Sequence, residues 1–348
     1  TRSYRIGSKN ERFRNNMRII RIFKKIVLVV FILTLSTIGI AETNITITPK
    51  ALQKGDTVGI IAPANYTPND ASYMIDYLES KGYKIVYGKS YYSKWYNFGG
   101  TDDVRADDIN GFFKDKNIKA IFSIRGGYGT IRILDKLDYN IIKENPKIFS
   151  GFSDITTLLI AINEKTGLVT YHGPMSSNFK DIPEVTENSF FDAYTKPGKE
   201  YNILSYDDDY SIVNAGKSEG EITGGNLSLI VASLGTEYEI NTDGKILFIE
   251  EIGEHTYRVD RMLQQLRLAG KLKNVKGIII GDFNRVNKEA IEDMSLDEVF
   301  KENFKDLDIP IIEGVNSGHV RPFITIPIGA DVTIDTSKNE IIVKNVVK

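Results

Sequence analysis

The chain of 348 residues contains no cysteine, one tryptophan and only three histidines, His172, His255 and His319. The absence of cysteine excludes thiol nucleophiles, disulfide bonds and thiolate metal sites together. Any mechanism that needs an imidazole must use one of those three histidines. The sequence also lacks the GxGxxG and Walker patterns of nucleotide-binding loops, so a phosphate-binding role has no motif to support it.

No apolar run reaches the roughly 20 residues that a membrane-spanning helix needs. The longest, residues 26–40, follows a basic stretch at 17–25 and precedes the small-residue pattern Gly39-Ile40-Ala41. This order predicts a secretory signal peptide, and therefore an exported protein in the periplasm or outside the cell. An uncleaved anchor is the alternative, and it would be the protein's only membrane contact. We interpret residues 1–16 as an extension upstream of the natural start at Met17, so 1–41 fall outside the folded domains.

Excess positive charge is also missing from the body of the protein. The whole chain has 44 Lys/Arg and 46 Asp/Glu residues, and nine of these basic residues and one acidic residue lie in positions 1–41. The remainder therefore holds 35 basic against 45 acidic residues, a formal charge of −10. Because phosphate backbones are bound by clustered cations, nucleic acid is not expected as a partner.

From residue 42 the pattern alternates between strands and helices, which predicts a parallel sheet with functional loops at the carboxyl ends of its strands. The expected strands are 56–63, 83–87, 118–124, 147–150 and 169–174, and the expected helices are 73–81, 101–113, 130–136 and a helix after residue 153 that ends at Gly167. The aromatic-rich stretch 91–98 is expected to be a loop. These elements define a first domain, residues 42–175.

Residues 176–218 are polar and have little periodicity, so we interpret them as a connecting segment that packs in part. A second domain, 219–348, is predicted from short strands and fewer helices. Its expected strands are 245–250, 277–281, 311–312 and a closing hairpin of 332–334 with 341–346; its expected helices are a short one ending at 234 and one that carries Val259, Met262, Leu263 and Leu266 on one face.

The sequence Gly151-Phe152-Ser153-Asp154 stands between a buried strand and an amphipathic helix. A serine at such a turn is how α/β hydrolases expose a nucleophilic hydroxyl, and the helix N-terminus offers N–H groups to an oxyanion. An ordinary helix-capping loop is the alternative interpretation. The turn Arg125-Gly126-Gly127 follows a neighbouring strand at the same sheet edge, and this convergence favours the nucleophile.

A serine nucleophile needs a base and an acid that orients the base. His319 is the preferred base because it lies in a Gly/Ser/Asn loop after a strand, whereas His172 is as well explained as a structural histidine. Glu250, at the end of a strand, is the preferred acid. Glu251 is the second choice, since adjacent strand residues point to opposite faces and only one of the two can reach the site.

Five blocks carry a resemblance to a known family: IRGGYGTIRILDKLDY, GFSDITTLLIAINEKTGLVTYHGPM, GGNLSLIVASLGT, ILFIEEIGEHTYRVDRMLQQLRLAG and GVNSGHVRPFITIPIGADVTID. In this order they resemble the LD-carboxypeptidase family, which includes murein tetrapeptide carboxypeptidases and microcin-immunity peptidases. The resemblance implies Ser153 as nucleophile, Glu250 as acid and His319 as base. It also implies an oxyanion hole from the backbone N–H groups of Asp154 and of the Gly126-Gly127 turn.

The implied fold is α/β, with an N-terminal flavodoxin- or amidotransferase-like parallel sheet and a smaller β-rich C-terminal domain. The implied reaction cleaves the amide between an L-centre, of diaminopimelate or lysine, and the terminal D-alanine of a peptidoglycan tetrapeptide. No metal or other cofactor is needed, and a homodimer is expected. Arg125 and Arg321 are candidates for the substrate carboxylate, which cannot be buried unpaired, and Gly225 and Asn226 are further substrate-binding candidates.

Family members that recycle the wall are usually cytoplasmic, so the export signal favours wall maturation here. Two other functions stay open. An amidase of the same fold, acting on a peptidyl-nucleotide or another modified peptide, would use the same three residues. An exported two-lobed binding protein would trap a small ligand without needing Ser153, Glu250 and His319 to meet.

Overall fold

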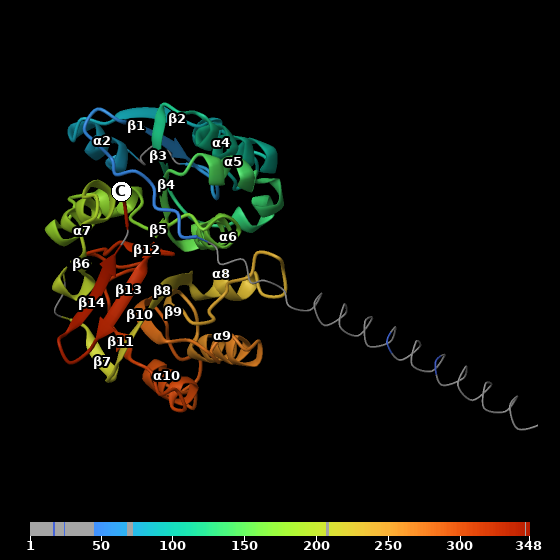
Figure 1. Ribbon diagram of the computed structural model, residues 1–348, viewed down its shortest axis with the longest axis vertical. Helices are drawn as coiled ribbons and strands as arrows, with labels where there is room; N and C mark the ends of the chain where they lie inside the picture. The colour runs from blue at the N-terminus through green and yellow to red at the C-terminus, as the bar shows by residue number, and fades with distance from the viewer. Residues whose placement is uncertain (1–16, 18–23, 25–44, 68–71, 207–208, 345) are drawn as a thin grey trace, which may run out of the picture. The chain divides into compact units, whose positions relative to one another are not determined.

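The first sheet has the strand order β2-β1-β3-β4-β5, with β12 added at one edge. A computed structural model describes residues 17, 24 and 45–348 except 68–71, 207–208 and 345, and residues 45–348 form one unit. The five parallel strands are β1 (Thr57–Ile61), β2 (Lys84–Tyr87), β3 (Ile118–Ser123), β4 (Ile148–Gly151) and β5 (Thr170–His172). This is the flavodoxin-like order, whose topological switch lies between β1 and β3. The predicted parallel sheet is confirmed (Figure 1).

Helices cover both faces of this sheet because its strands are apolar on both sides. One face packs against α2 (Tyr73–Ser80) and α7 (Glu184–Thr195); the other packs against α4 (Asp102–Lys114), α5 (Tyr139–Glu144) and α6 (Thr156–Thr166). Local signals set the helix ends: Thr101 Oγ1 accepts a hydrogen bond from the backbone N–H of Val104, and Gly167, with φ +76°, ends α6. The expected stop at Gly167 is confirmed.

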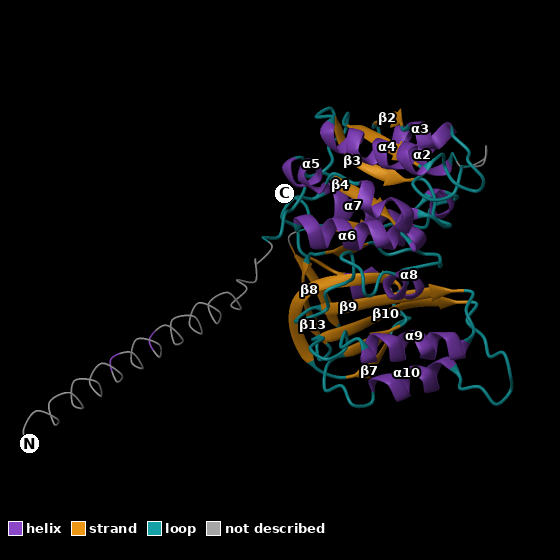
Figure 2. Ribbon diagram, turned by 90° about the vertical axis from the view of Figure 1, so that its right-hand side faces the viewer, coloured by secondary structure: helices purple, strands orange, loops and turns teal. Residues whose placement is uncertain are grey.

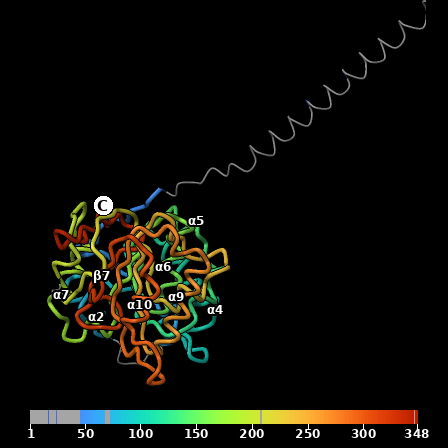
Figure 3. The backbone as a smooth tube through the Cα atoms, turned by 90° about the horizontal axis from the view of Figure 1, so that it is seen from below, coloured from blue at the N-terminus to red at the C-terminus, as the bar shows by residue number. Residues whose placement is uncertain are grey.

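The second sheet has the order β6-β14-β13-β8-β9-β10-β11-β7. Its parallel centre is β8 (Lys217–Asn226), β9 (Ile246–Ile252), β10 (Gly277–Asn284) and β11 (Ile311–Glu313), and its antiparallel flanks are β6 (Tyr201–Asn202), β7 (Ser211–Asn214), β13 (Asp331–Asp335) and β14 (Glu340–Lys344). One face packs against α8 (Leu227–Ala232), α9 (Thr256–Leu268) and α10 (Leu296–Phe304). Helices α9 and α10 lie side by side (Figures 2 and 3).

One apolar cluster connects the two sheets. It joins Ile60 and Phe122 of the first sheet to Phe248 and Ile279 of the second. The chain also returns from the second sheet to the first, because β12 (Ile326–Ile328) pairs antiparallel with β5. The carboxyl ends of β4 and β9, where the candidate site lies, are thereby held close to each other.

Several expectations about elements were wrong in detail. Residues 91 and 92 belong to a short helix, α3 (Lys89–Tyr92), rather than to a loop, and residues 130–136 form a 3₁₀ helix, η1 (Thr130–Lys136). The segment 176–218 contains α7, of which Phe190, Ala193 and Tyr194 are fully buried. Helices α5 and α10 and strand β12 were not anticipated.

The basic and apolar segment before residue 42 lies outside the described residues, apart from Met17 and Lys24. Within the part of the chain that the structure describes, no helix combines the length and apolar character needed to cross a membrane.

Candidate functional site

Ser153 lies at the turn between β4 and the helices η2 (Ser153–Ile155) and α6. Its backbone has φ +62°, a left-handed conformation that costs a non-glycine residue about 1–3 kcal/mol. This conformation turns the chain from the strand into the helix within one residue. The backbone N–H groups of the first helical turn have no acceptor within the helix, and Asp154 contributes one of them.

The glycine turn after β3 closes onto this serine. A Cβ atom at Gly126 would lie 3.0 Å from Ser153 Cβ and 3.2 Å from Ser153 Oγ, so the backbone can come this close only without a side chain. Gly126 and Gly127 line the same cavity as Ser153. The geometry therefore places backbone groups of both segments beside one hydroxyl, as an oxyanion site requires.

His319 connects Ser153 to Glu250. Its Nε2 is 3.1 Å from Ser153 Oγ, and its Nδ1 is 2.8 Å from Glu250 Oε2. Ser153 follows the first sheet, Glu250 lies on β9 of the second, and His319 lies between β11 and β12. The loop can cover the carboxylate because Gly318, at φ +130°, has no side chain; a Cβ there would lie 2.8 Å from Glu250 Oε2.

Glu250 is fully buried, and burial raises the pKa of its carboxyl above the ordinary value, while its contact with His319 opposes the rise. The neighbouring Glu251 is also buried but faces other partners. It accepts hydrogen bonds from Asn226 Nδ2 at 3.0 Å and from the Ser228 backbone N–H and Oγ at 2.8 and 2.6 Å. The structure thus brings Glu250, and not Glu251, to His319.

His172 packs against Phe152, as His319 does. Its ring packs against Phe152, Phe248 and Phe323, with centroid distances of 5.7, 5.0 and 5.6 Å, and neither ring nitrogen has a hydrogen-bond partner among the described residues. Burial lowers its pKa to about 3, so the ring is neutral. His172 is therefore a packed aromatic ring that does not reach Ser153.

A cavity of about 470 Å³ opens at the triad. Among its lining residues, Arg125 is the only permanent cation; the full lining is Tyr73, Ile124, Arg125, Gly126, Gly127, Phe152, Ser153, Met175, Ser176, Ser177 and His319. Tyr73, Met175 and Ser177 were not among the residues expected at the site. Tyr73 begins the helix after β1, so its position near the carboxyl end of a parallel strand was the signal that could have identified it.

Three of the expected substrate-binding residues do not line this cavity. Arg321 is exposed, and its Nη2 donates to the backbone carbonyls of Lys180 and Asp181. Asn226 is buried, and its side chain caps α8 and donates to Glu251. At Gly225 a Cβ atom would meet the side chain of Thr156 at 2.7 Å, so its backbone packs tightly within the protein.

Known proteins resemble this chain over most of its length. Two family models match the chain: the LD-carboxypeptidase N-terminal domain over residues 58–173 and the LD-carboxypeptidase C-terminal domain over residues 219–334. A probable murein peptide carboxypeptidase of Bacillus subtilis is 39% identical over 304 residues, which cover 85% of this chain and 94% of that protein. The microcin C7 self-immunity protein of Escherichia coli is 31% identical, covering 83% of this chain and 93% of that protein.

Solved structures show the same similarity. The microcin C7 self-immunity protein superposes with a TM-score of 0.78 at 28% identity, covering 85% of this chain and 98% of its own. A muramoyltetrapeptide carboxypeptidase from Oxalobacter formigenes gives a TM-score of 0.73 at 30% identity, covering 82% and 97%. The two-domain α/β fold expected from the sequence is confirmed.

Proposed function

The chain belongs to the LD-carboxypeptidase family of serine peptidases, and we propose that it releases the terminal D-alanine of peptidoglycan tetrapeptides. The bond cleaved is the amide that joins this D-alanine to the L-centre of diaminopimelate or lysine. The observation that carries the proposal is the relay of Ser153, His319 and Glu250, gathered from positions 166 and 69 residues apart.

The reaction follows from the two partners of His319, Glu250 at Nδ1 and Ser153 at Nε2. Glu250 accepts the Nδ1 proton of His319, which leaves Nε2 free to take the proton of Ser153 Oγ as the hydroxyl attacks the amide carbonyl. The imidazolium that forms lies beside a carboxylate, which stabilises its charge. His319 then protonates the departing amine of D-alanine, and water hydrolyses the acyl-enzyme.

Charge develops on the carbonyl oxygen during this attack. The proposed donors to this oxygen are the backbone N–H groups of Asp154, Gly126 and Gly127, because the strand-to-helix turn and the glycine turn meet at Ser153. Losing one donor of this kind typically lowers kcat about 10²–10³-fold.

The substrate's terminal carboxylate needs a cation within the same cavity. Arg125 fits this role because it lines the cavity beside Ser153, and among the described residues its guanidinium makes a single long hydrogen bond, 3.3 Å from Nη1 to the Tyr66 carbonyl oxygen. A planar guanidinium can bind a carboxylate through two hydrogen bonds. Arg125 would thus distinguish a chain end from an internal peptide bond.

The direct test supplies the purified protein with tetrapeptides that differ only in a terminal D- or L-alanine and measures the released amino acid. We expect D-alanine alone, and none from the Ser153→Ala variant. Release from neither peptide, while fluorophosphonate still labels Ser153, would disprove the proposed substrate and keep the nucleophile. Absence of labelling would also disprove Ser153 as the nucleophile, and it would favour a protein that only binds its ligand.

A second function is an amidase activity on modified peptides. It is supported by the similarity to the microcin C7 self-immunity protein, which has been solved in complex with aspartyl sulfamoyl adenosine. The same relay would cleave such an amide, and only the cavity would select the substrate. Hydrolysis of aspartyl sulfamoyl adenosine faster than of the D-alanine tetrapeptide would favour this second function.

We further propose that the protein is exported and acts on the maturing wall. The support is the basic and apolar pattern of residues 17–41, which matches a secretory signal. Fractionation of cells together with N-terminal sequencing of the mature protein tests this. A cytoplasmic protein that begins before residue 42 would contradict export with cleavage.

A further inference from the structure

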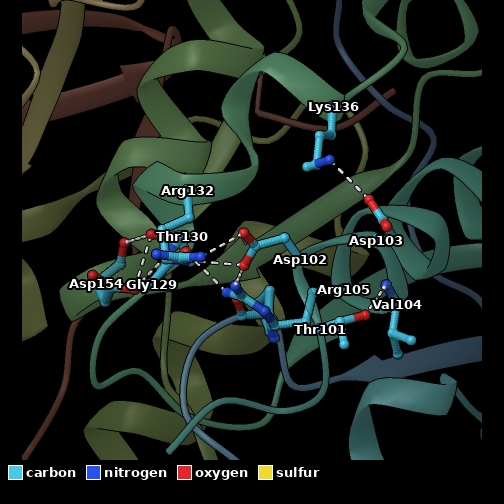
Figure 4. A network of polar contacts seen from close by, with 11 residues as sticks. Thr101, Asp102, Asp103, Val104, Arg105, Gly129, Thr130, Arg132, Lys136 and Asp154 are labelled. Carbon is cyan, nitrogen blue, oxygen red and sulfur yellow. Dashed lines mark hydrogen bonds and ion pairs between the residues drawn. The ribbon is translucent and has the colours of Figure 1, made fainter. Parts of the chain in front are cut away.

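The residue that follows the nucleophile carries a buried carboxylate that the proposed reaction does not use. Asp154 is 1% exposed, and its Oδ2 accepts a hydrogen bond from the backbone N–H of Thr130 at 2.9 Å. Thr130 Oγ1 lies 2.9 Å from the same oxygen and 2.5 Å from the Asp154 carbonyl oxygen (Figure 4). Burial raises the pKa of this carboxyl, and the bonds from Thr130 oppose the rise.

Thr130 directly follows the glycine turn 125–129, so these bonds connect that turn to the strand-to-helix turn at Ser153. The two turns come from different strands: the glycine turn follows β3, whereas the turn at Ser153 follows β4. Each supplies part of the proposed oxyanion site. The distance between Thr130 and Asp154 therefore helps to set the distance between the two groups of N–H donors.

The same end of the turn is also held by a buried guanidinium. Arg105 on α4 has no exposed surface, and its Nη1 donates to the carbonyls of Gly129 at 2.9 Å and Pro63 at 2.7 Å. Its Nη2 pairs with Asp102, which also receives two hydrogen bonds from Arg132, at 3.0 Å from Nε and 2.8 Å from Nη2 (Figure 4). The end of the turn is thus fixed by Arg105 at Gly129 and by Asp154 at Thr130.

We propose that the Asp154 carboxylate is a positioning residue that sets the spacing of the oxyanion donors. Its bonds end on Thr130, so it acts through the backbone of the glycine turn rather than on the substrate. Oxyanion donors are effective only at about 2.7–3.1 Å from the developing charge, and a misplacement of about 1 Å can lower the rate about 10²-fold. This inference rests on the proposed role of Ser153.

The test compares Asp154→Ala with Asp154→Asn. In the alanine variant the buried N–H of Thr130 loses its acceptor, so the turn can shift, and we expect kcat for D-alanine release to fall about 10²-fold with KM nearly unchanged. The rate at which fluorophosphonate labels Ser153 should fall by a similar factor, since its tetrahedral adduct uses the same donors. The asparagine variant keeps an oxygen that can accept from Thr130, so it should recover much of the loss.

Asp108 offers a matched control in the same domain. It is 7% exposed and accepts hydrogen bonds from the backbone N–H groups of Lys89 at 2.9 Å and Ser90 at 2.7 Å, but it does not line the cavity. Asp108→Ala should lower stability without changing kcat or the labelling rate of the folded protein. Thr130→Val, which removes only the hydroxyl, should have a smaller effect than Asp154→Ala.

The outcomes separate the inference from the proposed function. Normal kcat and normal labelling in Asp154→Ala would overturn the positioning role while wild-type D-alanine release still supported the function. Equal losses in the Asp154 and Asp108 variants would also overturn it, because they would reflect stability alone. If Asp154→Ala does not fold, Asp154→Asn and Thr130→Val decide: unaltered labelling in both refutes the inference. If wild type releases no D-alanine, labelling still tests the spacing.

Discussion

Two histidines pack against Phe152, and their surroundings make them chemically different. His319 packs edge-on to Phe152 at 5.0 Å and bonds to Glu250 and to Ser153. His172 packs against the same ring at 5.7 Å, but its other neighbours are Phe248 and Phe323. His172 is the last residue of β5, and His319 lies in the loop after β11. A buried carboxylate bonds to His319 and, among the described residues, none bonds to His172, which separates the proposed base from a structural ring.

The adjacent pair Glu250 and Glu251 repeats this difference. Both carboxylates are buried on the same strand, but only one of them bonds to His319. Glu250 bonds to an imidazole at the cavity, whereas Glu251 accepts bonds from Asn226 and Ser228. Residue type therefore does not assign a role in this protein; the bonding partner does. Six substitutions, in three pairs, test how far the contrast holds.

The largest difference is expected between substitutions of the two histidines. His319→Ala should lower kcat on the order of 10⁴–10⁶-fold, since a serine hydroxyl without its base is a poor nucleophile. His172→Phe should keep kcat within roughly tenfold of wild type, because an aromatic ring replaces a neutral ring of similar shape. Steady-state release of D-alanine measures both. Comparable losses of kcat in the two variants would show that the histidines do not differ in this way.

The two glutamates should differ almost as much. Glu250→Gln should lower kcat on the order of 10⁴-fold, because the amide no longer fixes the tautomer of His319 or stabilises its charged form. Glu251→Gln should instead lower the free energy of unfolding by about 1–3 kcal/mol through the bonds it disturbs. Urea denaturation with parallel kinetics separates the two. A large kcat loss in Glu251→Gln with unchanged stability would contradict the assignment.

The two arginines extend the comparison to substrate binding. Arg125→Ala should raise KM roughly 10–100-fold, as expected for loss of a charged hydrogen bond worth about 1.5–3 kcal/mol. Arg321→Ala should leave KM nearly unchanged, since its guanidinium bonds to backbone carbonyls away from the cavity. A peptide amidated at its C-terminus provides the control: it should be insensitive to Arg125→Ala.

The smallest effect concerns stability and pH. Burial lowers the pKa of His172 to about 3, whereas an unfolded histidine titrates near pH 6.5. Between these values the unfolded chain binds an additional proton, so the contribution of His172 to stability is complete above pH 6.5 and declines as pH falls, by about 1.4 kcal/mol per unit. His172→Phe should remove this part of the slope. Unfolding curves at pH 7, 6 and 5 measure it, and parallel slopes would contradict it.

Local patterns predicted much of the fold because they depend on neighbours in the sequence. The strands of the first sheet and the capped helix after Thr101 follow from apolar periodicity and capping. The prediction failed where local signals are weak. Strand β12 has three residues and contains Pro327, which is tolerated because β12 lies at a sheet edge. Helix α7 is polar in composition, and only tertiary packing buries Phe190 and Tyr194.

The site shows the same division. Ser153 could be identified from its strand–turn–helix context, and His319 from its loop, since both signals are local. The internal bonding of Asn226 and of Arg321 could not be read from the sequence, because it depends on contacts between distant segments.

The sequence by itself determined the strand-to-helix turn at Ser153, the helix that follows it and the glycine turn, because these depend on backbone preferences within a few residues. Only the tertiary structure decided which of two histidines and which of two glutamates reach that serine. The physical reason is that partners 69 and 166 residues apart meet only after two sheets have packed against a common core, and burial then sets the protonation of each group.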